Sequence, residues 1–373
     1  MQDSSKDIIY DAGVDIDDKD VIEIPEIASI NKEMKKIIIS SDMSREEIRS
    51  LVNSFYQHQD IRITKTEQLR SLERGVTAKG LDPSKQFQAL RYSLASAAAA
   101  EKSDNELLKY ACQSSEVGKW LMNIVGMGPA LSAGCLAYFD VTGINYASNF
   151  ISYAGLNDNN RPWLGREKSK KIIDEVIAKH APGEKSPKIT SDMVIEIAAK
   201  TKWKYQYLQE KACNAKGKWD KEKLIAACAK IPYNKSLKTH MWKIGKSFEY
   251  QKSRPSSLYG RLLAERIIKE MQKNEAGEYK ELIQQHMAEK NYSPGTDTYN
   301  AYMEGMLPQT EINARSRRWV QKIFISHLFE EMYRVTNDKI PPRYYTLEHC
   351  DGHHDEIEPE VPYTLVTEEK NKL

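Results

Sequence analysis

The sequence has few cysteines and no long apolar run, and both absences narrow the class of protein. Only five of the 373 residues are cysteines, and no two of them have the Cys-x-x-Cys spacing of a zinc or redox motif. A scattered, odd set is typical of reduced thiols in an intracellular protein. The apolar runs are far shorter than the roughly 20 residues that cross a bilayer, and the acidic start lacks the apolar core of a signal peptide. We therefore expect a cytoplasmic protein without a membrane partner.

The sequence between its acidic ends also lacks the alternation of apolar and polar residues that is typical of half-buried strands. Helical patterns are present instead. Residues 44–47 (Ser-Arg-Glu-Glu) have the pattern of a capping box, and Ile48, Leu51 and Val52 follow at helical spacing. The run 95–100 contains five alanines, the strongest helix former. We predict an all-α, multi-helix protein with flexible acidic tails at both ends.

The net charge of +2 is unevenly distributed. Residues 1–28 hold nine acidic residues and two lysines, and residues 346–373 hold eight acidic residues and two lysines. The central residues 29–345 hold 51 basic and 36 acidic residues, so their net charge is +15. A basic central region between acidic tails is common among proteins that bind polyanions. The tails either screen the basic surface, recruit a partner or only keep the protein soluble, and the last is the simplest explanation.

A glycine turn between two apolar segments, within 121–136, is the most specific motif. Gly126 and Gly128 permit a sharp turn and a close approach to a ligand, and Pro129 fits the first turn of a helix. The N–H groups that follow would lie at a helix N-terminus, where the dipole favours a phosphate. This is the pattern of the helix-hairpin-helix motif, which grips the DNA backbone without reading bases. The alternative is an ordinary corner between two helices.

The predicted DNA contacts follow from this motif. The backbone amides of Gly126, Gly128 and Ala130 are expected to hold phosphates, while Met127 points inward and ties the two helices together. The cations expected to add positive charge are Lys119, Arg161, Arg166, Lys168, Lys170 and Lys171. Such contacts are independent of base sequence and weaken steeply as salt rises.

Composition divides the chain into six predicted segments. They are an acidic arm (1–40), an N-terminal helical region (41–115), the helix-hairpin-helix region (116–175), a helical repeat rich in lysine and aromatic residues (176–247), a C-terminal helical region (248–345) and an acidic tail (346–373). Within the fourth segment, a capped helix, a break and a second helix occur twice, about 29 residues apart.

The same repeat has an unusual charge. Residues 200–247 contain thirteen lysines and three acidic residues, interleaved with aromatic residues such as Trp203 and Trp219. Lysines and aromatic rings together favour nucleic acid, through phosphate contacts and base stacking. The alternative is a solvated lysine surface over an aromatic core, and the excess charge favours nucleic acid slightly.

A cluster of potential metal ligands lies in the acidic tail, at residues 349–355. Imidazole, thiolate and carboxylate together are able to bind zinc. Because the spacing matches no zinc finger or ribbon, an exposed polar turn is expected instead. The weak candidate ligands are His349, Cys350, His353 and His354. We predict no cofactor, and a divalent metal would be required only by a catalytic form of the protein.

The hairpin and the segments after it resemble the C-terminal half of the IS-one-ten class of bacterial transposases. The shared order is the hairpin, residues 140–144 (Asp-Val-Thr-Gly-Ile), a helix ending at 152–156 (Ser-Tyr-Ala-Gly-Leu), and a basic stretch. Residues 257–262 (Ser-Leu-Tyr-Gly-Arg-Leu) and 314–319 (Ala-Arg-Ser-Arg-Arg-Trp) resemble the basic C-terminal helices of that family more weakly. The resemblance implies binding of DNA, or of DNA and RNA together.

The departures from that family concern catalysis. Those transposases begin with a ribonuclease-H-like domain whose strands carry acidic metal ligands, and no such pattern precedes the hairpin here. The family also uses a serine nucleophile beyond the hairpin, but Ser152, Ser169 and Ser236 lie in no recognisable motif. We therefore predict a nucleoid-associated protein of a phage or other mobile element, which binds DNA by backbone or shape and has no catalytic centre of its own.

Two alternatives stay open. One is an active, divergent transposase or recombinase that cuts through a serine or a metal. The other is a protein-interaction module in which the hairpin packs against a partner and the acidic tails dock a basic protein. The predicted partner of the leading hypothesis is DNA, with RNA or branched DNA as variants of it, and a homo-oligomer is compatible with each hypothesis.

Overall fold

The computed structural model describes residues 43–83, 86–157, 163–184, 187–342 and 357–370. These residues form helices and no β-strand, apart from one isolated bridge between Cys213 and Trp219. The predicted all-α fold is confirmed. The acidic arm at 1–40 and the start of the acidic tail lie outside the described residues. No described helix combines the length and hydropathy that crossing a bilayer requires.

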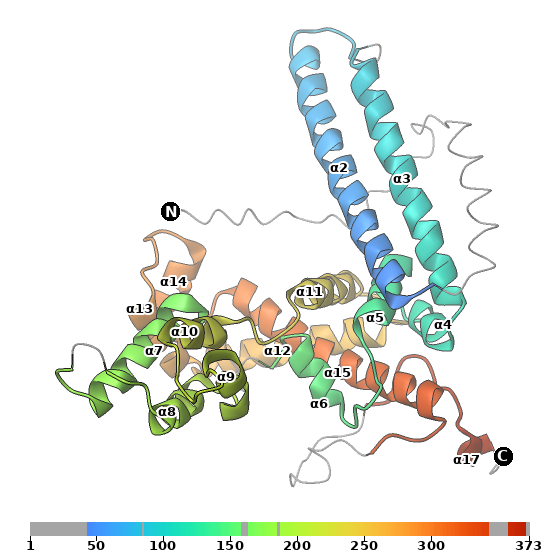
Figure 1. The fold of residues 1–373 in the computed structure, drawn as a ribbon. Helices are drawn as coiled ribbons and strands as arrows, with labels where there is room; N and C mark the ends of the chain where they lie inside the picture. Colours follow the sequence, from blue (N-terminus) through green and yellow to red (C-terminus); the bar gives the residue numbers. More distant parts are fainter. Residues whose placement is uncertain (1–42, 84–85, 158–162, 185–186, 343–356, 371–373) are drawn as a thin grey trace.

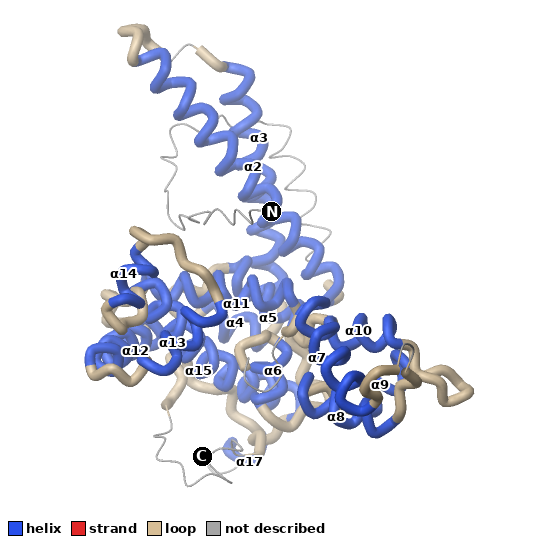
Figure 2. The backbone as a smooth tube through the Cα atoms, turned by 90° about the vertical axis from the view of Figure 1, so that its left-hand side faces the viewer, coloured by secondary structure: helices blue, strands red, loops and turns tan. Residues whose placement is uncertain are grey.

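Two long helices form an antiparallel arm that projects from the rest of the molecule (Figures 1 and 2). They are α2 (Arg45–Thr77) and α3 (Gln88–Gln113). The predicted cap is present, because the side chain of Ser44 accepts a hydrogen bond from the Glu47 backbone at 3.2 Å. At the base of the arm, apolar residues of α2 and α3 pack against the small side chains of the helix that follows the glycine turn.

The glycine turn joins α4 (Glu116–Met122) to α5 (Pro129–Tyr138). Helix α5 lies between the base of the arm and α11 (Lys235–Tyr250), and it contacts both. Its small residues permit this close packing. A Cβ atom added to Gly134 would lie 2.1 Å from a ring carbon of His240, which is too close for any real contact. Helix α5 is therefore a buried centre of the fold.

The largest core joins the hairpin to α6 (Ala147–Tyr153), α11, α12 (Leu258–Glu275) and α15 (Gln309–Asn337). Its fully buried aromatic side chains are Phe139, Phe150, Phe248, Tyr259, Phe324 and Phe329. Two short helices, α13 (Lys280–Glu289) and α14 (Asp297–Met303), add a small cluster beside α12 and the start of α15. We call this whole assembly of helices the body.

Four helices form a lobe with a separate core (Figures 1 and 2). They are α7 (Gly165–His180), α8 (Ser191–Thr201), α9 (Tyr205–Ala212) and α10 (Lys221–Ala229). The two predicted helix-break-helix copies are present as α8–α9 and α10–α11, but their packing differs, because α11 leaves the lobe for the core of the body. The segment boundaries predicted at 175 and 247 fall inside α7 and α11.

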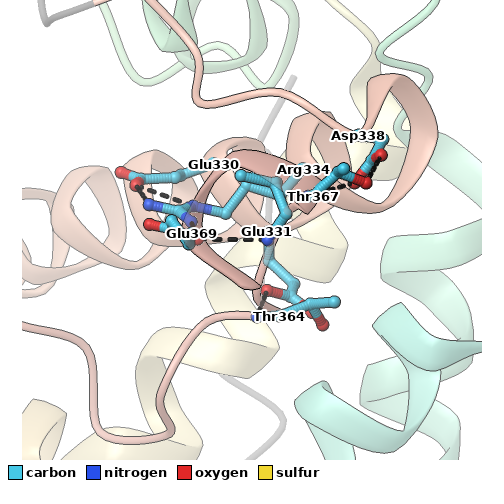
Figure 3. A network of polar contacts seen from close by, with 8 residues as sticks. Glu330, Glu331, Arg334, Asp338, Thr364, Thr367 and Glu369 are labelled. Atoms are coloured by element: carbon cyan, nitrogen blue, oxygen red, sulfur yellow. Dashed lines mark hydrogen bonds and ion pairs between the residues drawn. The ribbon is translucent and has the colours of Figure 1, made fainter. Parts of the chain in front are cut away.

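The C-terminal strap, residues 357–370, returns to the body and ends in α17 (Thr367–Lys370). Figure 3 shows its polar contacts with the end of α15. Glu331 accepts hydrogen bonds from the backbone and hydroxyl of Thr364, at 2.9 and 2.6 Å, and Arg334 forms an ion pair with Glu369 at 2.7 Å. The strap also reaches α4, where the indole of Trp120 donates to the carbonyl oxygen of Val361 at 2.9 Å.

Candidate nucleic-acid interface

The glycine turn is tied to α11 by its backbone. Gly126 has a φ of +93°, in the region that favours glycine, and its carbonyl oxygen accepts a hydrogen bond from the Ser247 hydroxyl at 2.5 Å. A Cβ atom at Gly126 would lie 3.0 Å from that hydroxyl. Met127 is buried in the core of the body, as the sequence predicts. The turn therefore has a rigid geometry, with a structural reason for its first glycine.

The predicted phosphate ligands of the turn differ in exposure. Gly128 caps α5, is exposed, and has open space where a side chain would be. Ala130 is only 7% exposed and packs with Ala111 and Cys112 of the arm. Since a phosphate needs an open approach, Gly128 is the better placed of these two residues.

The predicted cations do not gather around this turn. Lys119 lies on α4 and forms an ion pair with Glu116 at 2.7 Å. Arg161 lies outside the described residues. The exposed residues Arg166, Lys168, Lys170 and Lys171 belong to α7, whose main contacts are with α8 and α10 in the lobe. The α7 cations thus lie on the surface of the lobe, whereas the glycine turn belongs to the body.

The aromatic residues of the lobe form its core, which corrects the preference for base stacking at these positions. Trp203 and Trp219 are 9% and 8% exposed. The Trp203 ring stacks on Tyr207 with a centroid distance of 4.5 Å, and its N–H donates to the Cys228 carbonyl oxygen at 3.1 Å. Rings enclosed in this way have no free face for a base, so the alternative of an aromatic core beneath a lysine surface holds for both tryptophans.

Two other predicted groups are placed as follows. The candidate metal ligands His349, Cys350, His353 and His354 lie outside the described residues. Within the part of the chain that the structure describes, no three His, Cys, Asp or Glu side chains are grouped as metal ligands.

Among the candidate serines, Ser169 is fully buried and donates to the Gly165 carbonyl oxygen at 2.6 Å, whereas Ser152 and Ser236 are exposed on α6 and α11.

A basic cleft of about 270 Å³ lies between α12, α15 and the chain that leaves α6. We call it the arginine cleft. Its lining residues are Leu156, Asn157, Arg266, Glu270, Arg315, Arg318, Trp319 and Lys322. Four of these side chains are cationic and one is acidic, so the cleft has an excess of positive charge.

The single acidic residue of the cleft organises two of its arginines. Glu270 is 2% exposed; it pairs with Arg266 one helical turn earlier and with the Arg315 Nε atom at 3.3 Å. Burial alone would raise the pKa of this carboxyl group. The hydrogen bond from Tyr279, at 2.5 Å, and the charges of the two arginines outweigh burial, so the pKa is lowered. Glu270 is therefore an anion that holds both guanidinium groups at the cleft.

One donor of an arginine that lines the cleft lacks an acceptor. The Nε atom of Arg266 is buried and has no hydrogen-bond partner within the described structure. Its guanidinium group lies over the Trp319 ring, 5.2 Å from the centroid, and Arg318 is exposed beside it. A buried N–H without an acceptor costs about 1–3 kcal/mol.

Sequence reasoning identified the pieces of this cleft without joining them. Leu156 and the residues Arg315, Arg318 and Trp319 belong to two of the segments that resemble transposases, and the fold brings them to one cleft with Arg266 and Glu270 of α12. A local signal was available, because Arg315, Arg318 and Lys322 follow at helical spacing and so share one face of α15. The sequence did not show that this face of α15 meets Arg266 and Glu270 of α12.

The resemblance to IS-one-ten class transposases rests only on short sequence motifs. The resemblance therefore stays a prediction for this chain. No family model, no curated protein and no solved structure matches the sequence or the fold.

Proposed function

We propose that this protein binds nucleic acid through the sugar–phosphate backbone, with the arginine cleft as its main phosphate site. The observation that carries the proposal is the convergence of Arg266, Arg315 and Arg318 on one cleft that contains a single, fully engaged carboxylate. Guanidinium groups match phosphate oxygens in a planar, bidentate geometry. The net charge of +15 over residues 29–345 supports the same ligand, because it attracts polyanions from a distance.

The cleft is suited to phosphate rather than to a base. Glu270 holds Arg266 and Arg315 before a ligand arrives, and the Trp319 ring also contacts Arg266, so less side-chain entropy of these two residues is lost on binding. Phosphate contacts carry no sequence information, so recognition is expected to depend on backbone shape. The exposed Gly128 cap at the glycine turn is a supporting contact in this proposal. The transposase-like order of segments supports a phage or other mobile element as its setting.

The test is a binding titration with labelled duplex, single-stranded and branched DNA at two salt concentrations. The expected result is binding at low salt that weakens steeply as salt rises. Arg318→Ala should reduce the slope of log affinity against log salt by about 1, the effect of one lost phosphate contact.

The control for this variant is Arg70→Ala. Arg70 is also an exposed arginine, but it lies on the arm and pairs with Glu67 at 2.8 Å. Absence of binding to every DNA at low salt would overturn the proposal. Equal effects of the two variants would show that nucleic acid does not use the arginine cleft.

A further inference from the structure

A carboxylate of the C-terminal strap binds two backbone amides from distant parts of the body. One oxygen of Glu360 accepts a hydrogen bond from the Val125 N–H, in the glycine turn, at 2.6 Å. The other accepts from the Leu258 N–H, at the first residue of α12, also at 2.6 Å. Both bonds are short, as is typical when the acceptor is charged. An anion therefore already lies between the glycine turn and the start of α12.

The surroundings of this carboxylate favour an anion. Helix α12 has 18 residues, and its N-terminal dipole points at Glu360. Ser257 caps the helix by accepting from the Gly260 N–H at 3.1 Å, which leaves the Leu258 N–H for Glu360. The loop before α12 carries two exposed cations, Lys252 and Arg254. Backbone donors, a helix dipole and cations together form a phosphate-type site.

We propose that the Val125 and Leu258 amides form a second phosphate site, which Glu360 occupies in the unbound protein and yields to a nucleic-acid phosphate. This inference rests on the proposed nucleic-acid binding. Leu258 and Arg266 are eight residues apart on α12, about 12 Å along the axis. That span equals three to four base pairs at about 3.4 Å each, so the axial spacing of the two sites matches phosphates of one nucleic-acid backbone.

The strap is held by other contacts that do not use these amides. The Tyr363 ring stacks on Trp120 with centroids 6.3 Å apart, and the Glu331–Thr364 and Arg334–Glu369 contacts hold the residues beyond it. Exchange at the second site therefore requires movement of Glu360 and its neighbours rather than release of the whole strap. A carboxylate and a phosphate compete for the same two donors, so part of the acidic tail acts as a competitor of nucleic acid.

The first test replaces Glu360 by its uncharged isostere. Glu360→Gln should bind duplex DNA more tightly than wild type, because the competing charge is gone. The matched control is Glu358→Gln, which removes the same charge from an exposed position two residues away. The gain must exceed that of the control. A change no larger than the control, or a loss of affinity in a variant that still folds, would show that Glu360 is only a structural staple.

The second test removes a donor of the site. Leu258 is the first helical residue of α12, a position that tolerates proline, and Ser257 before it has an extended backbone with ψ of 110°. Leu258→Pro deletes the N–H and should lower the affinity for duplex DNA at a fixed low salt concentration, with little change in the salt slope, because a neutral donor releases no counterion. It should also cancel the gain in the double variant with Glu360→Gln. An unchanged DNA affinity in Leu258→Pro would overturn the inference, including in the case where Glu360→Gln does not fold.

Two outcomes separate this inference from the proposed function. If wild type binds DNA through Arg318 and the Glu360 variant gains nothing over its control, the arginine cleft stands and the second site falls. If wild type and all variants bind no DNA at low salt while their thermal unfolding is unchanged, the proposed function itself falls.

Discussion

The lobe and the arginine cleft are both rich in positive charge, but they use it differently. In the lobe, exposed cations such as Lys168 and Lys170 surround a core that contains Trp203 and Trp219. In the cleft, a few arginines from two helices face one opening, and a buried carboxylate orients them. The lobe thus carries more positive charges, which are spread over its surface. The cleft carries fewer, but they face the same opening.

This difference shows that charge density and a binding site are separate properties. Lysines over an aromatic core are what any soluble helical lobe requires, because apolar rings must be buried and the surface must stay solvated. Bringing several cations to one opening costs free energy, because like charges repel and a buried guanidinium group needs a partner. We therefore propose the cleft, rather than the lobe, as the phosphate site. The following predictions test the contrast between the two regions.

The largest expected effect is on the stability of the lobe. Trp203→Ala removes a buried ring and its hydrogen bond to Cys228, and should lower the free energy of unfolding of the lobe by about 3–5 kcal/mol. Because the body has a separate core, its own stability and its DNA affinity should change little. Hydrogen exchange resolved by region, together with DNA titration, measures both.

Ile195→Ala, at an exposed position on α8 of the same lobe, is the control for this variant. Its effect should stay within about 0.5 kcal/mol. A parallel loss of protection in α12 and α15 would contradict the division into two cores.

Acid should weaken the body before the lobe. Burial lowers the pKa of both His240 and His327 from 6.5 to about 4. Between these values the unfolded chain binds more protons than the folded one, so stability falls as the pH drops from 6.5 towards 4. Each histidine accounts for up to about 3 kcal/mol at the acid end. Burial raises the pKa of Glu331, which acts in the opposite sense and reduces the total effect.

Urea unfolding at pH 7 and at pH 4.5 measures this dependence. His327→Gln should reduce the pH dependence of the body, since the histidine that must gain a proton on unfolding is absent. His180 serves as the control, because it lies exposed on the lobe beside Glu196. The prediction is wrong if the lobe unfolds first as the pH falls, or if His327→Gln and His180→Gln change the pH dependence equally.

The smallest expected effect is on DNA affinity when the lobe loses charge. Replacing Lys168, Lys170 and Lys171 together by glutamine removes three exposed cations that no core interaction needs. Because these residues do not line the arginine cleft, the salt slope should change less than it does in the single variant Arg318→Ala. A larger effect of the triple variant would move the interface to the lobe and favour the sequence-based prediction of its residues.

The sequence predicted local structure well where the signal was local. The cap at Ser44 and the glycine turn with the buried Met127 appear where the residues indicated them. The sequence did not show which segments pack together, because contacts between distant residues decide that. Residues 166–171 follow the hairpin closely in the sequence, but α7 packs on α10, some 50 residues later, because their apolar faces fit each other there. The contact between Glu360 and Val125 has no sequence signal, since it joins residues 235 positions apart.

By itself, the sequence determined the helical class, the uneven charge and the sharp turn at Gly126, because periodicity, composition and backbone freedom are properties of neighbouring residues. Only the tertiary structure decided which cations meet and which aromatic rings are buried. It also decided that a strap carboxylate binds one amide of the glycine turn and one at the start of α12. Those outcomes depend on how helices with similar faces pair, and pairing is governed by shape and by the burial of apolar area across the whole chain.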